Sequence, residues 1–100
     1  MIDRVSKIAE DIGEETIAYR RDVHKHAESG WCEFRTASLV ARRLTDLGFE
    51  VQAGRQVVSE EDRMGLPTPD VLERRWERAR DQGGDLEFLK AVRGGFTGVV

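Results

Sequence analysis

The sequence is poor in residues that would cross-link or stiffen a small fold, with one cysteine and two prolines among 100 residues. A single cysteine cannot form an intrachain disulfide, so we expect a protein of a reducing compartment, the cytoplasm. No apolar run approaches the ~18 residues that a membrane-spanning helix needs, and residues 1–4 lack the features of a signal peptide. These absences predict no membrane partner.

Charged residues are abundant but almost balanced. They make up 35% of the chain against 39% for apolar residues, and the formal net charge is −3. So small a net charge gives no strong field to attract nucleic acid, so we expect no nucleic-acid partner. The length allows one small domain at most, with a thin core, because such chains bury only about two-thirds of their unfolded surface.

Two stretches, residues 2–26 and 33–47, carry apolar residues at the spacing of three or four that is typical of helices. Gly48 follows the second stretch, where the left-handed conformation that ends many helices suits glycine. Arg35 and the other charged residues of the second helix are predicted to face water. The apolar stripe of the first helix is Val5, Ile8, Ile12, Thr16, Tyr19 and Val23, and the buried face of the second is Phe34, Ala37, Val40, Ala41, Leu44 and Leu47.

Two short segments are predicted to be β-strands. Residues 49–53 alternate apolar and polar side chains, and residues 96–100 end in a β-branched pair. We expect the two strands to be neighbouring and antiparallel. Because two short strands do not form an independently stable sheet, we also expect the sheet and the chain to continue beyond residue 100.

The segment between these strands, residues 55–95, is predicted to be a helical excursion. The run Thr-Pro-Asp at 68–70 combines an N-cap hydroxyl, a proline and an acid in the first turn, which predicts a helix to about residue 82. A short helix is predicted over 86–92. Trp76 would either anchor a partner protein or pack on its own domain, and we favour the second alternative.

The turn between the first two helices holds His24, His26, Glu28, Cys32 and Glu33, all of them residue types that bind zinc. If residues 24–26 are helical, the two histidines point about 200° apart and cannot share an ion. The sequence also lacks His-x-x-Glu-His and Cys-x-x-Cys spacings. We therefore expect no metal site in the turn, a hydrogen bond from His24 to Glu28, a solvent-facing His26 and a packed, unreactive Cys32.

Residues 19–37 resemble the opening signature of the two-metal amidohydrolases and peptidases related to aminoacylase, hippurate hydrolase and glutamate carboxypeptidase. That signature reads Arg-Arg-Asp-x-His-x-His-Pro-Glu, then glycine, an aromatic residue and glutamate, with a following helix that ends in Leu-Gly-Phe-Glu-Val. Ala27 replaces the proline, and Ser29 stands where an aliphatic residue is usual. The Thr-Gly-Val-Val of residues 97–100 matches a strand of the family, so the resemblance covers nearly the whole chain.

The resemblance implies hydrolysis of an amide that joins an acyl or aroyl group to an amino acid such as glutamate. It implies two divalent ions, zinc or manganese, that activate a water molecule, with a glutamate as general base. It also implies a homologous second subunit or a homodimer. None of the family's catalytic residues or metal ligands maps onto residues 1–100, so we expect this chain alone to bind no metal pair and to be inactive.

Four residues of the turn are candidates for the border of a substrate cleft or for support of metal ligands: His24, His26, Glu28 and Glu33. The alternative is that they cap and brace the two helices, as most polar turn residues do, and we favour this alternative.

The predicted fold class is α/β, the amino-terminal portion of a mixed-sheet, zinc-peptidase-like metallohydrolase domain. Residues 1–54 would form helix, helix and strand, residues 55–95 the helical excursion, and residues 96–100 the second strand of a single incomplete catalytic domain. The rival hypothesis is a small helical protein-interaction module that has no catalytic activity.

Overall fold

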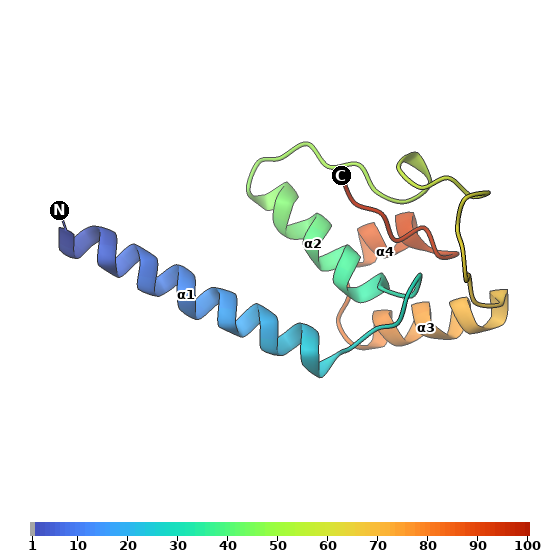
Figure 1. Cartoon of the computed structure of the whole chain (residues 1–100), viewed down its shortest axis with the longest axis horizontal. Coiled ribbons are helices and arrows are strands. Elements are labelled where there is room, and N and C mark those ends of the chain that lie inside the picture. The colour runs from blue at the N-terminus through green and yellow to red at the C-terminus, as the bar shows by residue number, and fades with distance from the viewer. Residues whose placement is uncertain (1) are drawn as a thin grey trace.

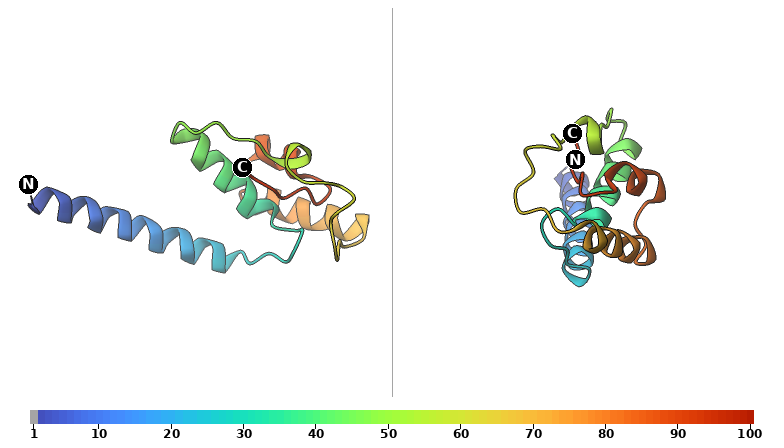
Figure 2. Two further views of the ribbon diagram at one scale, coloured as in Figure 1. Left: turned by 45° about the horizontal axis from the view of Figure 1, so that its top comes forward. Right: turned by 90° about the vertical axis from the view of Figure 1, so that its right-hand side faces the viewer.

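The computed structural model describes residues 2–100 and consists of helices joined by loops (Figure 1). The molecule is elongated, with principal extents of 54 × 28 × 23 Å. One long helix, α1, projects from a compact group formed by the other elements, as Figure 1 and the left view of Figure 2 show. The elements in chain order are α1 (Ile2–Lys25), α2 (Phe34–Asp46), the 3-10 turn η1 (Gly54–Gln56), α3 (Pro69–Asp81) and α4 (Leu86–Val92).

The core lies where α2 packs against α3 and α4. Trp76 of α3 is buried in it, and its indole Nε1 donates a hydrogen bond to the carbonyl oxygen of Leu89, at 2.6 Å. The prediction that Trp76 packs on its own domain is therefore confirmed, and its role as a partner anchor is excluded. The core residues are Cys32, Phe34, Ala37, Leu72, Trp76, Ala79, Leu89 and Val92.

The apolar side chains of α1 and the outer side of α2 do not join this core. The predicted stripe on α1 forms, but Ile8 and Ile12 are half exposed or more, and Val40 and Leu47 of α2 are also exposed. The prediction that Val40 and Leu47 are buried was wrong, because α3 and α4 cover only the opposite side of α2.

The ends of the helices follow from local chemistry. Gly48 has φ of 93°, and the chain reverses there with hydrogen bonds back to the last turn of α2. Pro69 occupies the first turn of α3, where its missing N–H costs no hydrogen bond. Asp85 caps α4, with its carboxylate accepting a hydrogen bond from the backbone N–H of Phe88. The Thr68 hydroxyl, in contrast, makes no capping bond.

The predicted α/β fold class and its mixed sheet are wrong for residues 2–100. The segments 49–53 and 96–100 do lie side by side and antiparallel, but they meet in one isolated bridge, Ala53 to Val99. Gln52 and Val100 exchange two hydrogen bonds of 2.8 Å, and the N–H of Gly54 donates to Gly98. The chain then turns into η1, so the pairing is too short to form a strand, and a stable sheet needs further strands.

Gly54 fixes the position of η1 against α4. Its φ is 79°, a conformation that disfavours other residues, and a Cβ at this position would overlap the carbonyl oxygen of Ala91 in α4. The backbones of the two elements therefore approach each other more closely than any side chain would allow. Among residues 2–100, no helix is both long and apolar enough to span a membrane.

Candidate functional site

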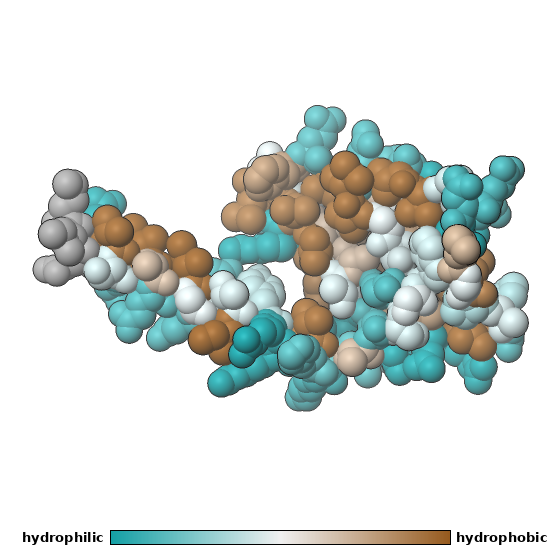
Figure 3. All heavy atoms as spheres, in the orientation of Figure 1, coloured by the Kyte–Doolittle hydropathy of each residue, from teal (hydrophilic) through white to brown (hydrophobic). Residues whose placement is uncertain are grey.

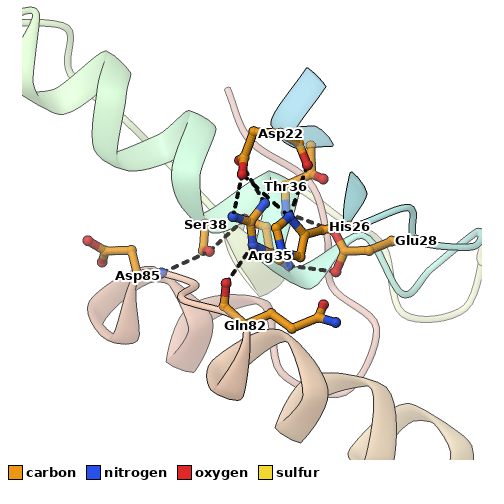
Figure 4. Close-up of polar contacts among 8 residues, drawn as sticks. All are labelled: Asp22, His26, Glu28, Arg35, Thr36, Ser38, Gln82 and Asp85. Atoms are coloured by element: carbon orange, nitrogen blue, oxygen red, sulfur yellow. Dashed lines mark hydrogen bonds and ion pairs between the residues drawn. The ribbon is translucent and has the colours of Figure 1, made fainter. Parts of the chain in front are cut away.

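Glu28 in the turn between α1 and α2 caps the amino terminus of α2. Its two carboxylate oxygens accept hydrogen bonds from the backbone N–H groups of Arg35 and Thr36, each at 2.8 Å (Figure 4). These N–H groups have no partner within the helix, and the negative charge lies at the positive end of the helix dipole. Both oxygens of Glu28 are thus engaged in holding the turn against α2.

Arg35 joins three segments that lie far apart in the sequence. Its guanidinium donates two hydrogen bonds to the carboxylate of Asp22 in α1, at 2.9 and 3.0 Å, and one from Nε to the carbonyl oxygen of Gln82, at 2.9 Å (Figure 4). The hydrogen bonds from Arg35 hold the pKa of Asp22 below its ordinary value, against partial burial, which acts to raise it. The prediction that Arg35 faces water was wrong, because its side chain is buried.

Ser38 and Asp85 extend the same network to α4. The Ser38 hydroxyl donates to the carbonyl oxygen of Arg35 and accepts a hydrogen bond from the N–H of Asp85. Arg42 binds the carboxylate of Asp85 at 2.8 Å. Burial acts to raise the pKa of Asp85, but the hydrogen bonds from Arg42 and from the N–H of Phe88 lower it overall. The network therefore links all four helices.

The two histidines have different environments. His26 is half-buried, and its Nδ1 lies 3.0 Å from the carbonyl oxygen of Asp22 and 3.4 Å from the Asp22 carboxylate. His24 lies on the exposed side of α1. The predicted hydrogen bond from His24 to Glu28 is not formed, since Glu28 caps α2, and the prediction that His26 faces solvent was wrong.

The described residues do not fit a metal pair. Within residues 2–100, no three side chains of His, Cys, Asp or Glu gather closely enough to hold an ion. Cys32 is buried in the core, and burial raises the pKa of its thiol, which disfavours the reactive thiolate. The prediction that Cys32 is packed in the core is therefore confirmed.

An open pocket of about 510 Å³ lies between the turn, α2 and the 97–99 segment. Glu33 lines it, and its carboxylate accepts a hydrogen bond from the Thr97 hydroxyl at 3.1 Å. Trp31 forms another wall, with an unusual φ of 63° and an indole N–H that donates to the Met64 carbonyl oxygen. The lining residues are Gly30, Trp31, Glu33, Thr36, Ala37, Val40, Thr97 and Val99.

Glu33 was predicted from the sequence as a candidate site residue, whereas Thr97 and Met64 were not. Thr97 lies 64 residues from Glu33, and no local pattern marks such a pairing. The pocket offers one carboxylate and hydroxyl groups beside apolar walls. It can hold an apolar group, and its lining residues include no histidine, cysteine, lysine or serine.

Comparison with known proteins identifies relatives of this chain. The chain is 55% identical over 82 residues to the A subunit of p-aminobenzoyl-glutamate hydrolase from Escherichia coli strain K12, covering 82% of this chain and 19% of the relative. It is 50% identical over 86 residues to indole-3-acetyl-aspartic acid hydrolase of Enterobacter agglomerans, covering 86% of this chain and 20% of that protein. No protein-family model matches the chain.

A solved structure agrees with these matches. The crystal structure of aminobenzoyl-glutamate utilization protein from Klebsiella pneumoniae superposes with a TM-score of 0.91 and 47% sequence identity. The match covers 94% of this chain and 24% of that one. The chain therefore spans about a fifth to a quarter of the length of these relatives.

The finer features of the sequence point the same way. The form His-Ala-Glu-Ser-Gly-Trp at 26–31, the Met-Gly-Leu-Pro at 64–67 and the Gly-Gly-Phe-Thr-Gly at 94–98 resemble the A subunit of p-aminobenzoyl-glutamate hydrolase. The identities above confirm that resemblance. By sequence and by structure, the chain is similar to the matching segments of the A subunit of p-aminobenzoyl-glutamate hydrolase, of indole-3-acetyl-aspartic acid hydrolase and of aminobenzoyl-glutamate utilization protein.

Proposed function

We propose that the chain is part of the catalytic domain of a metal-dependent amidohydrolase that cleaves p-aminobenzoyl-glutamate or a related N-acyl amino acid. The single observation that supports it most strongly is the 55% identity to the A subunit of p-aminobenzoyl-glutamate hydrolase. The second relative is named for indole-3-acetyl-aspartic acid. Both named compounds join an aromatic acyl group to an acidic amino acid, which defines the substrate class that we propose.

Within such an enzyme, this chain would supply structure instead of the reacting groups. The described residues form no cluster that fits two zinc or manganese ions, so the metal ligands would come from the part of the longer protein outside the matched segment. Residues 1–100 alone would then bind no metal pair and would not hydrolyse substrate. No catalytic step is assigned to residues of this chain.

The turn would border the substrate cleft of the complete enzyme, with His24, His26, Glu28 and Glu33 as its polar residues. Their contacts favour different roles. Glu28 is fully engaged as a helix cap, which supports a bracing role, whereas Glu33 lines the open pocket beside Trp31. Glu33 is therefore the most suitable of the four to lie near substrate.

We also propose a second subunit, homologous or identical, together with a cytoplasmic location. Two of the relatives carry names that designate an A subunit or its homologue, which suits a multi-subunit enzyme. The unpaired, buried Cys32 suits a reducing compartment.

A chimera tests the proposed activity. The matched segment of the Escherichia coli hydrolase is replaced by this chain, and release of p-aminobenzoate and glutamate from p-aminobenzoyl-glutamate is measured. We expect hydrolysis by the chimera and none by residues 1–100 alone. Arg35→Ala should lower the hydrolytic activity of the chimera, because it removes the hydrogen bonds that join α2 to Asp22 in α1. Arg74→Ala, which changes an exposed arginine of α3, should leave that activity unchanged.

Two outcomes would contradict the proposal. A folded chimera that hydrolyses no N-acyl amino acid would remove the activity and would favour the helical interaction module. Hydrolysis by the 100-residue chain alone would show that the reacting groups lie within it.

A further inference from the structure

Another pocket, which we call the basic pocket, lies between η1 with the loop that follows it, α3 and α4, and has a volume of about 490 Å³. That volume is typical of small-molecule sites in proteins. Figure 3 shows hydrophilic side chains along the right-hand edge of the molecule, where the loop between η1 and α3 lies, whereas hydrophobic residues gather along α1 and around the upper part of α2. The charged residues that line the basic pocket are Arg55, Arg63, Lys90, Arg93, Glu60 and Glu73.

Two of the four cations in the basic pocket already have an anionic partner. Arg93 binds the carboxylate of Glu73, and its guanidinium carbon lies 4.3 Å from the centre of a ring of Trp76. Arg55 pairs with the carboxylate of Glu60 at 3.6 Å. These pairs use both acidic residues of the pocket, so its excess positive charge must lie on the other two cations.

The remaining cations, Arg63 and Lys90, are available to an anion. Among the side chains that the structure describes, no carboxylate pairs with either of them. Nη1 of Arg63 donates a hydrogen bond to the carbonyl oxygen of Gly94 at 2.7 Å, and the guanidinium carbon lies 4.0 Å from the centre of the Phe96 ring. An arginine held in this way loses little conformational freedom when it binds an anion. Lys90 is exposed on α4.

Apolar side chains complete the wall of the basic pocket. Phe96 is almost fully buried against the guanidinium groups of Arg55 and Arg63, whereas Leu66 and Pro69 line the pocket and are exposed. An inorganic anion would use the cations but would leave these two apolar side chains in contact with water. An organic anion gains both from charge-assisted hydrogen bonds and from the burial of apolar area.

We propose that the basic pocket binds a small organic molecule that carries two carboxylates beside an apolar group. Arg63 and Lys90 each pair with one carboxylate, and the apolar group lies against Leu66 and Pro69. The N-acyl acidic amino acids of the proposed function belong to this chemical class, and their choice as the ligand rests on that proposed function. The preference for a dicarboxylate rests only on the charges and contacts of the pocket.

Binding of three probes to the 100-residue chain tests the proposal, with the amide chemical shifts in NMR spectra as the readout. The first probe, p-aminobenzoyl-glutamate, has two carboxylates and an aromatic group. The second, p-aminobenzoyl-glycine, lacks one carboxylate, and the third, glutarate, lacks the aromatic group. We expect the first probe to bind at least about fivefold more tightly than either of the others, because each of these loses one class of contact. The shifts should centre on Arg63, Lys90 and Phe96.

A pair of lysine variants locates the binding. Lys90→Gln removes a free charge of the pocket, and Lys25→Gln removes the charge of another exposed lysine, at the end of α1, as a matched control. Lys90→Gln should weaken the binding of p-aminobenzoyl-glutamate at least about fivefold, and Lys25→Gln less than about twofold, since a distant exposed charge is screened by salt. If the 100-residue chain does not fold alone, calorimetry on the chimera prepared without metal gives the same comparison.

Equal effects of Lys90→Gln and Lys25→Gln, or shifts confined to residues outside the pocket, would overturn the proposal. Inorganic phosphate that binds as tightly as p-aminobenzoyl-glutamate would reveal a simple anion site and would also overturn it. A chimera that hydrolyses p-aminobenzoyl-glutamate while the pocket binds none of the probes would support the proposed function and remove this inference. An inactive chimera whose pocket binds the dicarboxylate would contradict the proposed function and support this site.

Discussion

The core of α2, α3 and α4 and the projecting α1 use the same sequence pattern with opposite results. Both contain apolar residues spaced by three or four, yet Phe34 in α2 is 0% exposed and Ile12 in α1 is 57% exposed. Packing holds the core together, whereas α1 is attached through charged contacts such as Asp22 to Arg35 and Glu15 to Arg43. Helical periodicity thus shows which face of a helix is apolar, but not which element packs against that face.

We expect the largest loss in the free energy of unfolding from a substitution in the core. Phe34→Ala leaves a cavity among tightly packed side chains and should lower the free energy of unfolding by about 3–5 kcal/mol. Phe49→Ala removes an aromatic side chain that is largely exposed, so it should change that free energy by less than about 0.5 kcal/mol. Urea unfolding of the 100-residue chain measures both. Similar losses for the two variants would contradict the assigned core.

A smaller effect is expected at the turn that joins the two regions. Glu28→Ala removes both capping bonds of α2 and should cost about 1 kcal/mol in the free energy of unfolding. Glu50→Ala, which changes an exposed glutamate outside the helices, is the control. In the chimera, lost turnover with an unchanged melting temperature for Glu28→Ala would instead place Glu28 in the substrate cleft. The same pair of measurements on His26→Ala distinguishes the same two roles for His26.

Acid should weaken the attachment of α1 through Asp22. Because Arg35 lowers the pKa of Asp22 in the folded state, this pair contributes stability above the unfolded pKa of about 4, and the contribution is lost as pH falls through the lower folded pKa. Asp22→Asn should therefore lower the melting temperature at pH 7 but not near ~pH 2. An equal difference at both pH values would rule out this linkage.

The smallest effect is expected on the stripe of α1 in the 100-residue chain. Ile12→Ala should change the free energy of unfolding by less than about 0.5 kcal/mol, since little area is buried there and alanine favours helix. Leu89→Ala, at a fully buried position, provides the contrast and should cost about 2–5 kcal/mol. Thermal or urea unfolding compares the two, and a large loss for Ile12→Ala would indicate that the stripe is already packed.

The helices could be predicted from local sequence because their signals are local. The predicted ranges 2–26, 33–47 and 86–92 lie within one residue of the observed helices at each end. Apolar spacing and glycine or acid residues at helix ends suffice for this purpose. The two predicted strands failed because a strand depends on neighbours that only the folded chain or further chain supplies.

The network around the turn could not be predicted for a similar reason. Arg35 is buried by Asp22, 13 residues away, and by the carbonyl oxygen of Gln82, 47 residues away. Its position on α2 suggested a solvated residue, because the helical period describes one helix and not the segments that pack on it. The same limit led to the wrong partners for His24 and Glu28.

The close approach of Gly54 to Ala91 has a consequence for sequence variation at position 54. Since the backbone of η1 lies directly against α4, position 54 has a single tolerated residue wherever that contact is kept. A saturation library at this site should therefore return only glycine among folded members, and a sequence with a different residue there must carry η1 along another path.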